Sequence, residues 1–178
     1  MLRLIVPHLR LGSVRELSPD RLRQLGLEAL LLDVDCTLKR YSEQTVSAEV
    51  ARWLDELRAA GIGLCLISNG REKRIRRFAE SVGLPFVAKA CKPFPFGCWR
   101  AVRKMNFPPS RTAIVGDQLF ADVLAGRLAG LTSILVQPMH PEEEPWFTNL
   151  KRPPERCLLR WMKLDAQGSS GDVPNTRL

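Results

Sequence analysis

Residues 30–38 read Leu-Leu-Leu-Asp-Val-Asp-Cys-Thr-Leu. A short apolar run that ends in Asp predicts a buried strand with polar groups at its C-terminal tip. Because side chains alternate along an extended chain, Asp33 and Asp35 lie on the same side of it. Two carboxylates this close repel unless a cation or a shared proton intervenes, and oxygen ligands at that density suit Mg²⁺. An ordinary Asp-rich turn after a strand is the alternative that this stretch alone leaves open.

Length and charge set the broad class. A chain of 178 residues fits one domain with a proper core, which we expect over residues 1–165. Residues 166–178 are rich in Gly, Ser, Asp and Asn, and we expect a disordered tail there. The net charge of +8 predicts attraction to an anionic partner: nucleic acid, an acidic membrane face or a phosphorylated substrate.

The cysteines and the N-terminus indicate a cytoplasmic protein. Five cysteines are an odd number and form no C-x-x-C pair, which favours reduced thiols. The apolar runs are all shorter than the roughly 20 residues that span a bilayer, and Arg3 and Pro7 interrupt any signal-peptide core. Residues 1–17 mix leucines with arginines. They form either an amphipathic segment on a membrane surface or a segment that docks on its own domain.

Strand and helix patterns alternate along the chain. A helix that starts at Ser18-Pro19-Asp20 ends near Gly26, before the strand that leads to Asp33. Strands and helices then alternate, which predicts a parallel sheet of about five strands with helices on both faces. Trp99 is expected to point inward from the helix that contains it. The further strands are expected over 62–67, 85–88, 112–115 and 132–136, and the helices over 48–60, 71–82, 96–106, from about 119 to 129, and 154–164.

Polar residues follow several of the expected strands. Ser68-Asn69-Gly70 offers a hydroxyl and backbone N–H donors for a phosphate, although a plain strand-to-helix turn has the same residues. The arginines and lysine of residues 71–77 follow at once and form either a solvated face or an anion-binding surface. Since ligands of parallel sheets bind at the C-terminal strand ends, these side chains are expected to converge there: Asp33, Asp35, Ser68, Lys92, Asp117 and Asp122.

Four motifs in order resemble those of the haloacid dehalogenase (HAD) superfamily phosphatases. The resemblance covers about residues 1–165 and extends to the YqeG-like group of subclass IIIA. Cys36 departs from that group, which usually has Asn there, but this side chain is not a required ligand. The motifs are Asp33-Val34-Asp35-Cys36-Thr37, Ser68-Asn69, Lys92-Pro93 and Gly116-Asp117-Gln118 followed by Asp122.

The resemblance implies a HAD-like Rossmannoid three-layer sandwich and an aspartyl-phosphate mechanism. Asp33 is then the nucleophile, and Asp35 protonates the leaving oxygen and later activates water. Mg²⁺ is held by Asp33, the backbone carbonyl of Asp35, and Asp117. The phosphoryl group is bound by Ser68, a backbone N–H of Asn69 and Lys92, whereas Asp122 supports Lys92 or a metal-bound water.

The short connections between motifs leave no room for a large cap domain. An open site suits a phosphate presented on a surface, and the YqeG-like group is similar to phosphatidylglycerophosphatases of fungal mitochondria and plant plastids. We therefore expect hydrolysis of phosphatidylglycerophosphate by a peripheral enzyme on the inner face of a membrane, without a stable protein partner. The alternatives are a phosphatase of a soluble or protein-borne phosphomonoester, and a non-catalytic nucleic-acid-binding protein on the same fold. Crowded carboxylates argue against the last.

Overall fold

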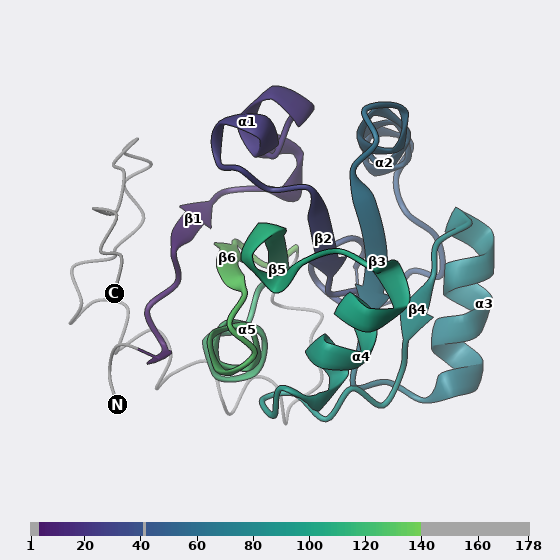
Figure 1. The fold of residues 1–178 in the computed structure, drawn as a ribbon. Coiled ribbons are helices and arrows are strands. Elements are labelled where there is room, and N and C mark those ends of the chain that lie inside the picture. Colours follow the sequence, from purple (N-terminus) through teal and green to yellow (C-terminus); the bar gives the residue numbers. More distant parts are fainter. Residues whose placement is uncertain (1–3, 41, 140–178) are drawn as a thin grey trace.

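The computed structural model describes residues 4–40 and 42–139. Its centre is a six-stranded parallel sheet in the order β1-β6-β5-β2-β3-β4 (Figure 1). The strands are β1 Leu9–Leu11, β2 Ala29–Leu32, β3 Gly63–Ile67, β4 Phe86–Val87, β5 Thr112–Gly116 and β6 Thr132–Val136. The predicted α/β class with a parallel sheet is confirmed.

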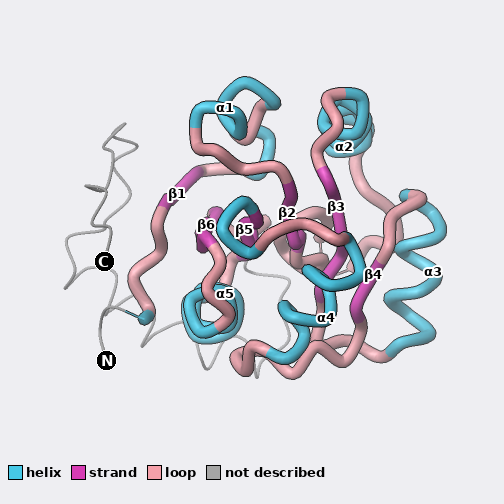
Figure 2. The backbone as a smooth tube through the Cα atoms, viewed as in Figure 1, coloured by secondary structure: helices cyan, strands magenta, loops and turns pink. Residues whose placement is uncertain are grey.

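Helices cover both faces of this sheet, and they alternate with the strands along the chain (Figure 2). The first three helices pack with Leu30 and Leu32 in one hydrophobic core, whereas α4 and α5 pack with Leu31 in another. The three layers follow from this alternation, because neighbouring side chains of a strand point to opposite faces. The helices are α1 Pro19–Gln24, α2 Ala48–Ala59, α3 Glu72–Val82, α4 Phe96–Met105 and α5 Leu124–Leu128, with short turns η2 Val14–Glu16, η3 Pro109–Arg111 and η4 Leu119–Val123.

The central strand β2 fixes the position of the polar edge. All four of its residues are buried, as expected for a strand covered on both faces. Leu32, its last residue, pairs with Leu66 of β3 and with Val115 of β5. These three strands therefore end at the same level. The residues that follow them, including Asp33, Ser68 and Asp117, emerge at one edge of the sheet.

The sixth strand, β1, lies within the N-terminal segment, which the sequence left open between two readings. β1 extends the sheet beside β6, and Leu11, Val14 and Leu17 are buried. The indole Nε1 of Trp53 also donates a hydrogen bond to the carbonyl of Leu17 at 2.9 Å. Residues 9–17 therefore pack on the domain. Three residues are too few for a recognisable alternation, which explains why β1 was not predicted as a strand.

The expected inward position of Trp99 is wrong, because its exposed fraction is 48%. The buried face of α4 is instead formed by small residues, among them Gly97, Cys98 and Ala101. A Cβ at Gly97 would lie 2.5 Å from the carbonyl oxygen of Ala90, so the helix approaches its neighbour too closely for a large side chain. The helix expected to follow residue 118 begins as a π-helical turn, η4.

Some predicted segments lie outside the described residues. These are the last helix, over 154–164, and the tail, over 166–178. Within residues 4–40 and 42–139, every helix is too short or too polar to cross a bilayer.

Candidate functional site

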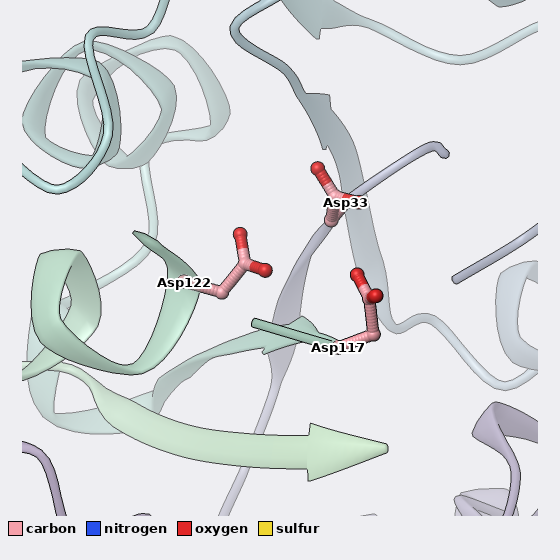
Figure 3. A group of neighbouring side chains, drawn as sticks. All are labelled: Asp33, Asp117 and Asp122. Carbon is pink, nitrogen blue, oxygen red and sulfur yellow. The ribbon is translucent and has the colours of Figure 1, made fainter. Parts of the chain in front are cut away.

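Three buried carboxylates meet at the C-terminal edge of the sheet (Figure 3). Asp33 follows β2, Asp117 follows β5, and Asp122 lies on η4. One carboxylate oxygen of each lies within 4.8 Å of the others. The convergence depends on the register of β2 and β5, in which Leu32 pairs with Val115, so that Asp33 and Asp117 emerge at the same edge.

Lys92 lies inside this cluster. Its Nζ is 2.5 Å from Oδ1 of Asp33 and 2.5 Å from Oδ1 of Asp122, and all three side chains are buried. Burial alone lowers the pKa of Lys92, but the charges of Asp122 and Asp33 outweigh it and raise this pKa. Lys92 is therefore a permanent cation at the site.

One lysine does not neutralise three carboxylates. Burial raises the pKa of Asp33 well above its usual value, against the opposing charge of Lys92, and the charges of Asp122 and Asp117 raise it further. A buried group of like charges is unfavourable unless a further cation joins it. Carboxylate oxygens at this spacing fit a hard divalent cation, so the donor set suits a metal.

The Gly116-Asp117 pair allows Asp122 to approach the cluster. A Cβ at residue 116 would lie 2.2 Å from Cγ of Asp122, so only glycine leaves enough space. The backbone N–H of Gln118 donates to Oδ2 of Asp122 at 3.1 Å, and the backbone N–H of Asp122 donates back to the carbonyl of Gln118. These two hydrogen bonds orient the Asp122 carboxylate toward Lys92.

Ser68 and Asn69 lie beside the cluster, and their side chains have different partners. Ser68 is buried, and its Oγ accepts the backbone N–H of Gly70 at 3.0 Å. The Asn69 side chain pairs with the backbone of Lys92: its Nδ2 donates to the Lys92 carbonyl at 2.9 Å, and its Oδ1 accepts the Lys92 N–H at 2.8 Å. Asn69 thus holds the loop that presents Lys92.

Asp35 is not part of the three-carboxylate group, and basic side chains from α3 and from its own loop hold its carboxylate instead. Its carboxylate accepts two hydrogen bonds from Arg74, at 2.6 and 2.7 Å, and one from Lys39 at 3.1 Å. Burial raises the pKa of Asp35, but the hydrogen bonds and charges of Arg74 and Lys39 outweigh burial and lower it. Cys36, the next residue, has φ +62°, a left-handed conformation that Asn adopts more readily than most residues.

A basic groove opens next to Asp35. It has a volume of about 580 Å³ and lies between α3 and the loop that follows Asp35. Arg74 connects this groove to the carboxylate of Asp35. Among the charged residues that line it, cations outnumber carboxylates: Lys39, Arg71, Lys73, Arg74 and Arg77 against Glu43. The arginine-rich stretch of α3 therefore faces a cavity at the site.

Four residues that support the carboxylates of the site were given no role from the sequence. Lys39 and Arg74 hold Asp35, Thr37 donates from Oγ1 to Oδ1 of Asp117 at 3.2 Å, and Gly116 makes space for Asp122. Thr37 and Gly116 were quoted within the motifs, which was a usable signal. Arg74 was recognised only as one charge in a basic run, and its pairing with a residue 39 positions away depends on the tertiary fold.

Comparison with known sequences gives a consistent result. A family model described as haloacid dehalogenase-like hydrolase matches residues 7–130. "Probable phosphatase YqeG" of Bacillus subtilis is 31% identical over 151 residues, which cover 85% of this chain and 87% of that protein. "Phosphatidylglycerophosphate phosphatase 1, chloroplastic/mitochondrial" of Arabidopsis thaliana is 22% identical over 170 residues, which cover 89% of this chain and 49% of that protein.

Solved structures share the fold. "NagD from E.coli K-12 strain" has a TM-score of 0.53 at 14% identity, with 82% of this chain and 94% of that chain covered. The cobalt-bound deoxy-D-mannose-octulosonate 8-phosphate phosphatase YrbI of Haemophilus influenzae has a TM-score of 0.52 at 14% identity, with 76% and 89% covered. The chain belongs to the haloacid dehalogenase-like hydrolases, in their YqeG-like group, and is a phosphoric monoester hydrolase.

Proposed function

We propose that this enzyme removes the terminal phosphate of phosphatidylglycerophosphate, giving phosphatidylglycerol, at the inner face of a membrane. The observation that carries the proposal is the basic groove beside an uncapped site. Two of its five cations, Lys39 and Arg74, contact Asp35, and a second anionic group of a bound substrate would be placed in this groove. The Arabidopsis relative named as a phosphatidylglycerophosphate phosphatase supports the same substrate class.

The catalytic cycle divides the work between two carboxylates. Asp33 attacks phosphorus, so that a bond forms between its carboxylate oxygen and phosphorus while the bond from phosphorus to the glycerol oxygen breaks. Asp35 gives its proton to the departing oxygen, and as a carboxylate it then takes a proton from the water that hydrolyses the aspartyl phosphate. Free phosphate leaves, and both carboxylates return to their starting states.

Other residues hold the transferring group and prepare the nucleophile. Lys92 lies 2.5 Å from Asp33 and offsets charge on that carboxylate and on the incoming phosphate. Ser68 and the backbone N–H of Asn69 bind the phosphoryl oxygens. Asp122 keeps Lys92 in position through its own 2.5 Å contact.

Asp33, Asp117 and the backbone carbonyl of Asp35 would hold Mg²⁺. When bound, the ion neutralises the carboxylates and polarises the phosphate, which otherwise repels its nucleophile. Thr37 orients Asp117 for this role through its hydrogen bond to Oδ1. Asp122 contacts Lys92 in the same group and supports the arrangement through it.

The lack of a cap among the described residues supports a surface-bound substrate. A loop and α2 connect β2 to β3, and α4 with the short turn η3 connects β4 to β5. Neither connection forms a separate domain over the site. A small metabolite would remain exposed to water there, whereas a lipid headgroup reaches the site while its acyl chains stay in the bilayer.

The test compares two substrates with the same purified protein and Mg²⁺. Phosphate release is measured from phosphatidylglycerophosphate in mixed micelles and from a soluble aryl phosphate, with Asp33→Asn and EDTA as controls. The proposal predicts a strong preference for the lipid that both controls abolish. Efficient release from the soluble ester alone would retain the chemistry and reject the lipid substrate.

A further inference from the structure

Three exposed aromatic side chains form a continuous patch at the start of α4. Phe94, Phe96 and Trp99 have exposed fractions of 59%, 56% and 48%. Their rings touch in sequence, with centroids 6.0 Å apart for Phe94 and Phe96 and 5.8 Å apart for Phe96 and Trp99. A contiguous exposed apolar patch, unlike a single exposed apolar side chain, is typical of an interaction site. We call these three residues the aromatic patch.

The aromatic patch begins shortly after Lys92 in the sequence. Phe94 is two residues beyond Lys92, and α4 begins at Phe96. Because α4 follows β4 and returns antiparallel to the sheet, its N-terminus lies at the edge where the strands end (Figure 1). The patch therefore flanks the opening of the site on one side of the sheet, and the basic groove at the start of α3 flanks it on the other.

The exposed charged side chains of α4 and of the loop before it, residues 88–105, have one sign. They are Lys89, Arg100, Arg103 and Lys104. Arg100, one position after Trp99, contacts the carbonyls of Ala88 and Lys89 and keeps its charge beside the patch. An apolar centre with a cationic surround is complementary to an anionic phospholipid surface.

We infer that the aromatic patch is the site at which this enzyme inserts into an anionic phospholipid bilayer. The inference rests on the proposed function, since it places the opening of the site against the headgroups. Trp and Phe are suited to the interface, where apolar rings enter the acyl boundary and the indole N–H stays hydrated. A second copy of the chain is a poorer occupant, because a symmetric contact would bring the two cationic surrounds together.

The experiment is flotation of the full chain with vesicles of phosphatidylglycerol and phosphatidylcholine, and with vesicles of phosphatidylcholine alone. The test variant is Phe94→Ser/Phe96→Ser/Trp99→Ser. The matched control is Leu25→Ser/Leu128→Ser, which removes two apolar side chains of similar exposure, 43% and 42%, elsewhere on the surface. Thermal unfolding of each variant shows that it folds. We expect the test variant to lose about tenfold or more in partitioning to the anionic vesicles, and the control to bind like the wild type.

Quenching by brominated lipid locates the contact. Wild-type tryptophan fluorescence is expected to fall on the anionic vesicles, and Trp99→Phe is expected to bind normally but to lose most of that quenching. Vesicle binding by the folded triple variant at the wild-type level would overturn the inference. A loss of vesicle binding in the leucine control equal to that in the triple variant would overturn it too. Both measurements are independent of turnover. If the wild type binds vesicles through the aromatic patch but does not hydrolyse phosphatidylglycerophosphate, the proposed substrate is rejected and the membrane contact is retained.

Discussion

Lys92 contacts two carboxylates at once, and its position depends on several neighbouring residues. Asn69 pairs with the backbone of Lys92, Asp122 holds its ammonium group, and Gly116 gives Asp122 the space to do so. These contacts position the reactive side chains. Their geometry matters because a displacement of about 1 Å in a reactive group can lower the rate about 100-fold.

Gly116→Ala tests this dependence. The new methyl group would overlap Asp122, so the carboxylate must move and release Lys92. We expect kcat to fall about 100-fold, with Lys92 misplaced relative to the phosphate. Gly126→Ala is the matched control, since its Cβ would lie 2.2 Å from Cγ2 of Ile114 in the core, away from the cluster. It should lower the melting temperature but leave kcat of the folded protein near the wild-type value. Equal loss of kcat in both variants would contradict the account.

Asp117→Asn tests the charge balance of the cluster. Removing one of three buried carboxylates lowers the repulsion that raises the pKa of Asp33. Without metal, we therefore expect the free energy of unfolding to rise by about 1 kcal/mol. Mg²⁺ should raise the melting temperature of the wild type, but not that of this variant. Asp55→Asn, an exposed carboxylate whose side chain is 71% exposed, is the control. Undiminished Mg²⁺ stabilisation of Asp117→Asn would refute its role as a ligand.

At the scale of elements, α3 supplies a charge to a loop that follows a different strand. Arg74 lies near the start of α3 and pairs with Asp35, and Lys39 approaches the same carboxylate from the loop itself. Together they keep Asp35 ionised in the absence of substrate, whereas its proposed first task is to donate a proton. We expect an anionic group of the substrate to compete with Asp35 for Arg74.

Arg74→Gln should therefore change the pH profile as well as the rate. Arg74 lowers the pKa of Asp35, so its loss raises this pKa. The value of kcat/KM decreases as pH rises through the pKa of a general acid in the free enzyme. We expect this decreasing limb to move to higher pH in Arg74→Gln. Arg76→Gln, which breaks a pair with Glu72 on the same helix, should leave it in place. If the decreasing limb of the kcat/KM profile does not move in Arg74→Gln, Arg74 does not control the pKa of the general acid.

The elements themselves were largely predictable from the sequence. Apolar runs that end in polar residues located β2, β3, β5 and β6, because strands buried on both faces have no other sequence pattern. Trp99 was assigned to the core because apolar residues usually face inward, but the buried face of α4 is formed by Gly97, Cys98, Ala101 and Val102. The Arg74–Asp35 pair could not be predicted, since no periodicity shows which loop a helix terminus will meet.

At the scale of the whole molecule, the net charge and the open edge act together. A charge of +8 attracts an anionic surface, and the cations of the groove lie at the edge where the site opens. Within residues 4–40 and 42–139, the short connections between the strands place no separate domain over that edge. The charge was evident from the sequence, but its concentration at one edge depended on the topology.

Turnover of lipid substrate on anionic vesicles should therefore depend on salt. Raising the ionic strength from about 0.05 M to about 0.5 M shortens the screening length and should lower the rate several-fold. Hydrolysis of a soluble aryl phosphate by the same protein should change much less, because it needs no surface attraction. A parallel loss with both substrates would mean that salt acts on the catalytic site, and would refute long-range attraction.

The most direct test of the central claim, that Asp33 receives the phosphoryl group, is an adduct with beryllofluoride. This fluoride complex of beryllium mimics a phosphoryl group bonded to a carboxylate oxygen. Fluorine NMR of the protein with beryllofluoride and Mg²⁺ should show a bound species, accompanied by a higher melting temperature. The bound species should form in Asp55→Asn but not in Asp33→Asn. An adduct that persists in folded Asp33→Asn would contradict the assignment of the nucleophile and the mechanism built on it.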